Sequence, residues 1–426
     1  MKTENGKLKK YKLGEYIDSF GDGIHGTPNY DEKGEYYFIN GNNLKDGQLN
    51  ITEDTLKISS NEYSKIKRRL IPNNTILVSI NGTLGNVALY KSENIALGKS
   101  ACYLNLKDSS FRFFLRYLLK TKEFKNYMNR VAGQSTIKNV SPTQISEYEF
   151  FAPPLESQQK IAAVLSALDD KIALNNRMNA KLEQMAKRLY DYWFVQFDFP
   201  NADDKPYKST GGKMVWNEEL KREIPEGWEV TPLKECINHI NTGLNPRDNF
   251  VLGNGNIKYI TVKNLTESGM IDFSNCDLID EEARSMVHNR SDIKIGDILF
   301  ASICPLGRCY LINEEPKDWD INESVFTIRP NYKNMSSQFL YNILRDEYYV
   351  RKMTQKATGS IFKGIRVDDL GKMEIVLPSK EIIDSFTAKI TPLLNQQAKL
   401  QQESMKLSEM RDKLLPLLMN GQVIVN

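Results

Sequence analysis

The sequence predicts an α+β protein in which two copies of one α+β domain are separated by two long helices. The helices are expected to pair as an antiparallel coiled coil, which gives the molecule pseudo-twofold symmetry. Two observations predict this fold: an internal repeat near 220–225 residues, and two heptad seams of apolar residues. We expect a first domain at 1–152, a long helix at 153–198, a linker at 199–225, a second domain at 226–378 and a C-terminal long helix at 379–426.

The internal repeat appears as ordered matches between the two halves of the chain. Ile76-Leu77-Val78 and Leu84-Gly85 match Ile298-Leu299-Phe300 and Leu306-Gly307 at an offset of 222 residues. Other matches keep the same order at offsets of 221 to 225, and they join Asn43-Leu44 to Asn264-Leu265, Phe114-Leu115 to Phe339-Leu340, and Ser135, Lys138 and Val140 to Ser360, Lys363 and Ile365. Solenoid repeats run about 20–50 residues. A period this long therefore indicates a duplicated domain.

The first heptad seam lies in residues 153–193. Its apolar residues step by three and four, which is the a/d pattern of a coiled coil and narrower than the apolar face of an ordinary core helix. These residues are Ile161, Leu165, Leu168, Ile172, Leu182, Ala186, Leu189 and Trp193, and Asn175 and Asn179 take two further a/d places. The rhythm returns near the C-terminus at Ile383, Phe386, Ile390, Leu393, Gln397, Leu400, Ser404, Leu407, Arg411, Leu414 and Leu418. A narrow apolar seam needs a partner helix in water. We therefore expect the two seams to pack against each other.

The polar positions of the seams predict how the helices align. If the polar layers meet, Asn175 lies against Ser404 and Asn179 lies near Leu400. Pro392 should kink or restart the second helix, and Pro416 should end it, because proline lacks the N–H that a helix interior needs. At ~1.5 Å per residue, a helix of roughly forty residues is about 60 Å long.

Inside each copy, short runs of β-branched and aromatic residues predict strands, as at 36–40, 75–80 and 86–90. One amphipathic helix is predicted at 111–131 and its repeat at 338–353. Residues 199–223 are rich in Asp, Lys, Pro and Gly, which is typical of a connector.

Charge is distributed unevenly along the chain. Residues 1–150 carry 22 Lys and Arg against 16 Asp and Glu, whereas residues 226–378 carry 18 against 22. The basic first domain suits nucleic acid, and the acidic second domain argues against it. No apolar run approaches a membrane span, the N-terminus has no apolar signal region, and five scattered cysteines fit a reducing compartment. We therefore expect a cytoplasmic protein.

Catalytic and metal-binding patterns are incomplete. Gly98-Lys99-Ser100 resembles the end of a P-loop, but Glu93 stands where that loop needs glycine. Cys236 and His239 lack a second ligand pair at metal-site spacing. There is no G-x-S-x-G elbow and no N-P-P-aromatic or D-P-P-aromatic tetrapeptide of amino-methyltransferases. We expect no catalysis, no metal and no cofactor in this chain.

Two repeat-related loops, 133–139 and 358–366, have the residues of a nucleic-acid contact. Glycine allows the backbone to approach a phosphate, Ser and Thr donate to it, and Lys neutralises it. Gln134 and Asn139 have the amides that bind adenine edges, while Arg366 or Arg308 suits guanine. The candidate DNA-binding residues are Asn43, Ser79, Asn81, Thr83, Gln134, Ser135, Thr136, Lys138, Asn264, Arg308, Ser360, Lys363 and Arg366. For any one residue, an ordinary turn before a strand is an equal explanation. The basic run Lys65, Lys67, Arg68 and Arg69 is equally compatible with a solvated face.

Several motifs together resemble the specificity (S) subunit of type I restriction–modification systems. They are Pro153-Pro154-Leu155-Glu156-x-Gln158-Gln159-x-Ile161, Leu168-Asp169-x-Lys171-Ile172, Leu189-x-x-x-Trp193-Phe194-Val195-x-Phe197 and Ile224-Pro225-Glu226-Gly227-Trp228. The strand-and-glycine signature is similar too, at Ile76-Leu77-Val78-Ser79 before Gly82-Thr83-x-Gly85. In the second copy, Cys304-Pro305 replaces Gly82-Thr83, and Pro378-Ser379 replaces the double proline.

The resemblance implies two target-recognition domains, each of which recognises half of a bipartite double-stranded DNA target. The long helices would be spacer regions that fix the half-site distance and dock two methyltransferase (M) subunits. The M subunits would methylate adenine N6 with S-adenosylmethionine, and the restriction (R) subunits would cleave DNA with ATP. Magnesium would also belong to these partner subunits. The alternative is a non-catalytic coiled-coil scaffold whose duplicated domains bind protein. A standalone methyltransferase is opposed by the missing motifs.

Overall fold

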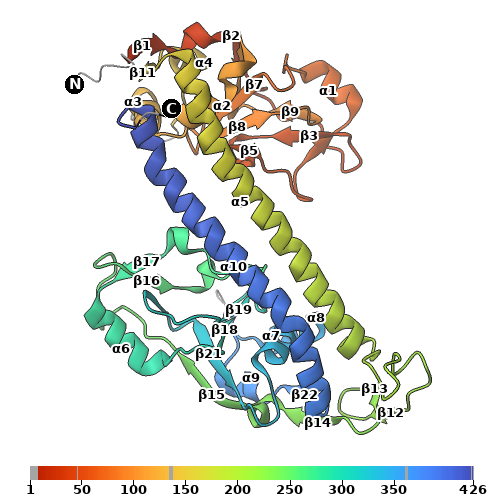
Figure 1. Ribbon diagram of the computed structural model, residues 1–426. Coiled ribbons are helices and arrows are strands. Elements are labelled where there is room, and N and C mark those ends of the chain that lie inside the picture. The colour runs from red at the N-terminus through yellow and green to blue at the C-terminus, as the bar shows by residue number, and fades with distance from the viewer. Residues whose placement is uncertain (1–7, 46, 134–137, 360–362, 424, 426) are drawn as a thin grey trace. The chain divides into compact units, whose positions relative to one another are not determined.

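The computed structural model describes residues 8–45, 47–133, 138–359, 363–423 and 425. The chain forms two compact units: unit 1 comprises Met1–Ala173 with Met405–Asn426, and unit 2 comprises Leu174–Ser404. The two long helices, α5 (Leu155–Tyr190) and α10 (Lys380–Met419), each contribute one part to both units (Figure 1).

Unit 1 contains two main sheets. The first is antiparallel in the order β2 (Ile17–Asp22), β10 (Ala101–Leu106), β7 (Thr75–Ser79) and β8 (Val87–Tyr90). The second has the order β6 (Lys57–Ile58), β3 (Tyr36–Ile39) and β9 (Ile95–Leu97), with β3 and β9 parallel. Two further antiparallel pairs are β1 (Lys9–Lys12) with β11 (Glu149–Ala152) and β4 (Leu44–Lys45) with β5 (Gln48–Leu49). The helices are α1 (Ser60–Ile66), α2 (Arg112–Leu118), α3 (Lys122–Val131) and α4 (Pro142–Ser146).

Unit 2 repeats the two main sheets of unit 1 and its β1–β11 pair, whereas the β4–β5 pair is reduced to a single bridge between Leu265 and Ile271. Its antiparallel sheet has the order β15 (Ile237–Thr242), β21 (Val325–Pro330), β18 (Ile298–Ala301) and β19 (Cys309–Leu311). Its mixed sheet has the order β17 (Asp277–Ile279), β16 (Ile257–Ile260) and β20 (Trp319–Ile321), with β16 and β20 parallel. The third pair is β14 (Glu229–Pro232) with β22 (Glu374–Leu377), and the helices are α6 (Glu281–Ser291), α7 (Ser337–Arg345), α8 (Glu347–Lys356) and α9 (Val367–Gly371). The predicted domain duplication is confirmed.

The predicted heptad seams are the buried sides of the long helices. All the named seam residues of α5, of α10 and of the turn at Trp193 are buried or partly buried. In unit 2, Asn175 contacts Glu403 and the Asn179 carbonyl accepts from Gln397 Nε2. Residue numbers rise along α5 as they fall along α10, so the pairing is antiparallel. A short π-helix (Asp191–Val195) follows α5.

The polar partners in the seam differ by one position from the prediction. Asn175 was expected against Ser404, but its Nδ2 donates to Glu403 Oε2 at 2.9 Å. The longer glutamate side chain reaches the buried amide. The Ser404 hydroxyl is buried and has no hydrogen-bond partner among the described residues.

The two prolines do not divide the second helix. Pro392 lies within α10, and α10 continues three residues beyond Pro416 to Met419. Leu418 and Met419 are buried in the core of unit 1. Their burial favours a last helical turn although Pro416 provides no N–H.

Each predicted amphipathic helix is two helices. In unit 1 the helix is interrupted between α2 and α3, and the Thr121 hydroxyl caps Phe124 N at the start of α3. In unit 2 the Asp346 carboxylate caps Tyr348 N and Tyr349 N at the start of α8. The capping side chains satisfy the free N–H groups of a new helix, which stabilises a turn that apolar periodicity does not reveal.

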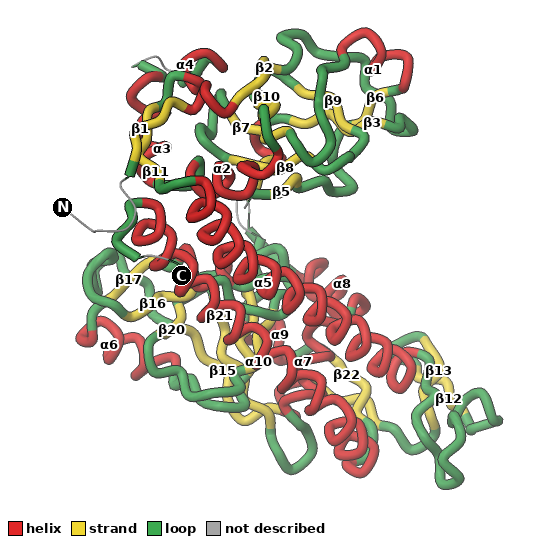
Figure 2. The backbone as a smooth tube through the Cα atoms, turned by 45° about the horizontal axis from the view of Figure 1, so that its top comes forward, coloured by secondary structure: helices red, strands yellow, loops and turns green. Residues whose placement is uncertain are grey.

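The predicted connector is partly a folded hairpin. It contains β12 (Met214–Asn217) and β13 (Arg222–Pro225), which follow the end of α5 (Figure 2). Phe199 is buried against Trp228, with ring centroids 4.9 Å apart. The aromatic residues that flank the polar stretch therefore attach it to the core of unit 2.

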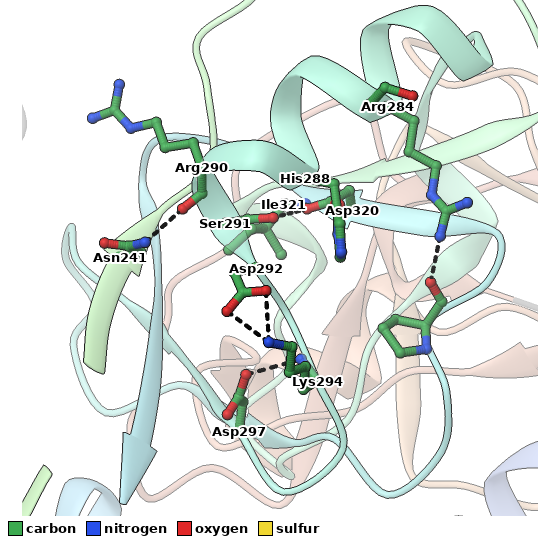
Figure 3. Close-up of polar contacts among 12 residues, drawn as sticks. Asn241, Arg284, His288, Arg290, Ser291, Asp292, Lys294, Asp297, Asp320 and Ile321 are labelled. Carbon is green, nitrogen blue, oxygen red and sulfur yellow. Dashed lines mark hydrogen bonds and ion pairs between the residues drawn. The ribbon is translucent and has the colours of Figure 1, made fainter. Parts of the chain in front are cut away.

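A buried polar cluster lies beside the second sheet of unit 2. Asp320 is fully buried, and the Ser291 hydroxyl donates to its Oδ1 at 2.6 Å (Figure 3). His288 Nδ1 lies 3.0 Å from Asp320 Oδ2. Because Ser291 donates to the aspartate and not to the imidazole, the arrangement does not activate a nucleophilic serine. Among the described helices, none has the length and apolar character to cross a membrane.

Candidate nucleic-acid interface

In unit 1, two segments far apart in the sequence meet at the end of β7. Val140 N donates to the Ile80 carbonyl at 2.9 Å, and Asn81 forms a bridge with Asn139. The turn after β7, which carries Thr83, therefore lies beside the segment that carries Lys138. Residues predicted to bind nucleic acid are brought together by backbone hydrogen bonds.

Unit 2 has the same arrangement at the end of β18. Cys304 N donates to the Lys363 carbonyl and Ile365 N donates to the Ser302 carbonyl, both at 2.8 Å. Ile303 also forms a bridge with Gly364. The turn after β18 and the segment at 363–365 thus form a second copy of the same loop pair.

A glycine in each turn makes this arrangement possible. Gly85 and Gly307 have φ angles of 76° and 87°, which glycine adopts without strain. A Cβ on Gly307 would lie 2.7 Å from the side chain of Val350 on α8, and one on Gly85 would lie 3.6 Å from that of Lys125 on α3. The equivalent helices therefore pack on the equivalent turns.

The basic residues of the loop pairs are exposed. These basic residues are Lys138, Lys363 and Arg366, and Thr83 is exposed beside them. Lys138 Nζ donates to Asn129 Oδ1 at 2.9 Å, which holds the ammonium group near α3. Gln134, Ser135, Thr136 and Ser360 lie outside the described residues.

Three candidate residues have structural contacts. Asn264 is 1 % exposed, accepts hydrogen bonds from Thr261 and donates to the Asp272 carbonyl. Asn43 makes the equivalent contacts with Asn40 N and the Asn50 carbonyl. Ser79 is fully buried and accepts from Asn86 N. These side chains shape the turns, and none presents a free group to a base.

Other candidates are partly committed to ion pairs or backbone contacts. Arg308 Nη2 lies 3.1 Å from Glu267 Oε1, so a base contact would compete with that carboxylate. In the basic run, Lys65 pairs with Glu62, and Arg68 donates to the carbonyls of Asp22 and Gly23. Lys67 and Arg69 are exposed.

A basic groove beside the second loop pair was not predicted. It has a volume of about 310 Å³, and α8 contributes Lys352 and Lys356 while Lys372 follows α9. Asp369 and Glu374 also line it. Lys352 and Lys356 stand four positions apart, a helical spacing that could have indicated this face from the sequence.

The buried thiols are unsuited to nucleophilic chemistry. Burial raises the pKa of Cys236 to about 11 and that of Cys309 to about 12. Burial also raises the pKa of Cys276 to about 11. These groups therefore stay protonated near neutral pH, whereas a cysteine nucleophile reacts as the thiolate.

Sequence comparisons identify the family to which the two repeats belong. The family described as "Type I restriction modification DNA specificity domain" matches residues 5–184 and again 225–404. The chain is 29 % identical over 389 residues to the type I restriction enzyme MjaIX specificity subunit of Methanocaldococcus jannaschii, covering 89 % of this chain and 83 % of that protein. It is 25 % identical over 362 residues to the HindI specificity subunit of Haemophilus influenzae, covering 73 % and 77 %.

A solved structure shares the fold. The crystal structure of a type I restriction-modification system S subunit from M. genitalium superposes with a TM-score of 0.57 at 18 % identity, covering 98 % of both chains. The duplicated domains, the two long helices and the matched sequence agree with one another. The chain belongs to the type I restriction modification DNA specificity domain family, as a non-catalytic specificity subunit that carries two copies of the domain.

Proposed function

We propose that each unit recognises one half of a bipartite double-stranded DNA target. The observation that carries this proposal is the repeated loop pair, in which Thr83 and Lys138 in unit 1 correspond to the turn after β18 and Lys363 in unit 2. Each pair exposes a cation on a fixed backbone. A duplicated surface of this kind suits a target made of two separate half-sites.

The contacts divide into phosphate contacts and base contacts. Lys138 and Lys363 neutralise phosphates, and Arg366 donates to a guanine edge. Gln134, Ser135, Thr136 and Ser360 belong to the same two loops by sequence and complete the proposed surface. Asn81 and Arg308 lie at its border. To contact DNA there, Arg308 would break its ion pair with Glu267.

The basic groove extends the proposed surface of unit 2. Lys352, Lys356 and Lys372 are placed to follow a phosphate backbone that leaves the loop at 363–366. A local cluster of cations offsets the net negative charge of residues 226–378, because charges beyond about 8–10 Å are largely screened at physiological salt. The acidic composition of this half is therefore compatible with DNA binding.

The long helices are proposed to set the half-site distance and to dock two M subunits. On α5, Leu174, Met178 and Met185 are 43 %, 39 % and 54 % exposed. They lie on one flank of α5 beside the buried seam, at spacings of four and seven residues, so a helix of M could bury them. S-adenosylmethionine, ATP and magnesium would then act on the M and R subunits, in the cytoplasm, with adenine N6 methylation and cleavage done by those partners.

Domain replacement tests the proposal. The chain with M is expressed in cells, residues 1–152 are replaced by the first domain of another specificity subunit, and methylated adenines are mapped across the genome. One half of the methylated target should change and the other should stay. A change in both halves would contradict independent recognition.

The alternative is a coiled-coil scaffold whose domains bind protein, and the negative charge of residues 226–378 favours it. Duplex binding by the complex with M distinguishes the two. A scaffold would leave the M subunits with the same sequence preference whichever first domain is present.

A further inference from the structure

A cavity of about 360 Å³ lies in unit 2 where α5 passes into its π-helix. Its walls come from the end of α5, the start of α8, β13 and β22. Six of its fifteen lining residues are aromatic: Tyr190, Phe194, Trp228, Phe339, Tyr348 and Tyr349. π-Helical turns occur frequently at functional sites. The cavity is separate from the loop pair at 302–308 and 363–366, since none of those residues lines it.

Two arginines, Arg222 and Arg351, line this cavity, and Arg222 is the one that packs among its aromatic rings. Arg222 lies over the rings of Phe197 and Tyr348, 5.0 and 5.4 Å from their centroids. Its Nε is buried without a hydrogen-bond acceptor, and the buried Tyr348 hydroxyl also has no partner among the described residues. A buried donor left unpaired costs about 1–3 kcal/mol. Both residues line the cavity, Arg222 from β13 and Tyr348 from α8.

The three carboxylates that line the cavity, Asp191, Asp346 and Glu347, have partners of their own in its wall. Asp191 and Glu347 pair with Lys187 at 3.1 and 3.3 Å. Asp346 accepts from the first N–H groups of α8. No described carboxylate forms an ion pair with Arg222, so its positive charge has no partner in this part of the structure.

We propose that this cavity binds a small molecule that carries a carboxylate or a phosphate on a flat apolar group. The planar fork of Arg222 suits either anion, and the Tyr348 hydroxyl supplies a further hydrogen bond. A bare anion would leave most of the cavity empty. The aromatic walls favour a flat ring that stacks at about 4.5–7 Å between centroids.

Calorimetric titration of the full-length chain with four probes tests the proposal. Phenyl phosphate and benzoate carry both features, inorganic phosphate lacks the ring, and benzamide lacks the charge. The first two should bind at least about tenfold more tightly than the last two, as expected for a hydrogen bond to a charged group together with ring burial. Equal binding of inorganic phosphate and phenyl phosphate would refute a site for a flat anion.

Variants locate the binding. Arg222→Gln should weaken phenyl phosphate and benzoate at least about tenfold, and Tyr348→Phe, which removes only the unpaired hydroxyl, about threefold. Arg290→Gln removes an exposed arginine of α6 in the same unit and should change nothing (Figure 3). Lys363→Ala should also have no effect, because it belongs to the proposed DNA surface. Unchanged affinity in both Arg222→Gln and Tyr348→Phe would place the probes elsewhere and overturn the assignment.

Discussion

The side-chain amide of Asn175 on α5 donates a hydrogen bond to Glu403 Oε2 on α10 at 2.9 Å. Asn175 is fully buried, and its Oδ1 has no partner among the described residues. A buried polar group in a coiled-coil seam fixes the register of the helices at a cost in stability. The pair joins the two helices inside unit 2.

Asn175→Leu should therefore leave the free energy of unfolding unchanged or raise it, while the register of the helices loosens. The leucine fills the seam and removes the unpaired oxygen. Urea denaturation gives the stability, and the distance distribution between spin labels at Lys181 and Gln396 gives the register. Asn176→Leu is the matched control, because Asn176 faces solvent on the same turn. A narrow distribution in Asn175→Leu, equal to that of the control, would show that the asparagine does not fix the register.

Asp169 joins three elements of unit 1. Its carboxylate pairs with Arg116 of α2, accepts from Tyr117 at 2.7 Å and accepts from Arg411 of α10 at 2.8 Å. Arg116 is 7 % exposed. Asp169→Ala should lower the free energy of unfolding by about 3–5 kcal/mol, because it leaves a buried guanidinium without its partner. The exposed neighbour in Asp170→Ala should cost little in the same urea experiment.

The effect of Asp169 should depend on pH. Burial opposes ionisation, but the hydrogen bonds from Arg411 and Tyr117 and the charge of Arg116 lower the pKa of Asp169 overall. A lowered pKa contributes stability above the unfolded value near 3.9, and this contribution is lost as pH falls through the folded value. The difference between wild type and Asp169→Ala should thus shrink between pH 7 and pH 3. A difference that stays constant would assign the effect to packing alone.

Asp320 should show the opposite pH dependence. Burial raises its pKa, although hydrogen bonds from Ser291, Ile321 N and His288 oppose the rise. A raised pKa favours the folded state below the unfolded value near 3.9 and loses that contribution as pH rises through the folded value. Asp320→Asn should therefore gain stability relative to wild type from pH 3.5 to pH 7. Asp318→Asn, at an exposed position nearby, should follow wild type at every pH.

Periodicity predicted the elements whose burial follows one rule. The seam residues from Ile161 to Trp193 and from Ile383 to Leu418 needed only the three-and-four rhythm, and the strands at 36–40 and 75–80 needed only short runs of aromatic and β-branched residues. The breaks at Thr121 and Asp346 depend on single capping side chains, which the apolar pattern does not report. The prediction that Pro416 ends the second helix was wrong, because the burial of Leu418 in the core of unit 1 outweighs the local preference of proline against a helix interior.

The candidate site was predicted as loops and less well as side chains. The repeat offset paired Lys138 with Lys363, and the structure places both at exposed positions; their contact with DNA stays a prediction. Asn43 and Asn264 were also predicted to bind DNA, although both side-chain amides form hydrogen bonds inside their own turns. Sequence cannot distinguish an asparagine that caps a turn from one that faces DNA, since both occur in polar loops. The groove of Lys352, Lys356 and Lys372 was missed because its residues come from two segments.

Lys138→Ala and Lys363→Ala should each weaken binding to all DNA sequences alike. If each lysine neutralises one phosphate, the slope of log affinity against log salt should fall by about one. Fluorescence anisotropy of a labelled duplex, with M present, measures the slope. Lys333→Ala, an exposed lysine outside both loop pairs, is the control. An unchanged slope would remove the substituted lysine from the interface.

The long helices provide the last prediction, because they connect the two units and are proposed to act as a ruler. Seven residues inserted in each helix, after Ala173 in α5 and after Ser404 in α10, preserve the heptad pattern on both sides. Each insertion lengthens its helix by roughly 10 Å at ~1.5 Å per residue. Base pairs rise ~3.4 Å along the duplex. The spacer of the methylated target should therefore grow by about three base pairs, with both half-site sequences retained, or methylation should fail because the half-sites rotate out of phase. The same seven residues placed in the turn between β12 and β13 lengthen the chain outside the helices and should leave the spacer unchanged. Full methylation at the original spacer after the helix insertions would show that the helices do not set the distance.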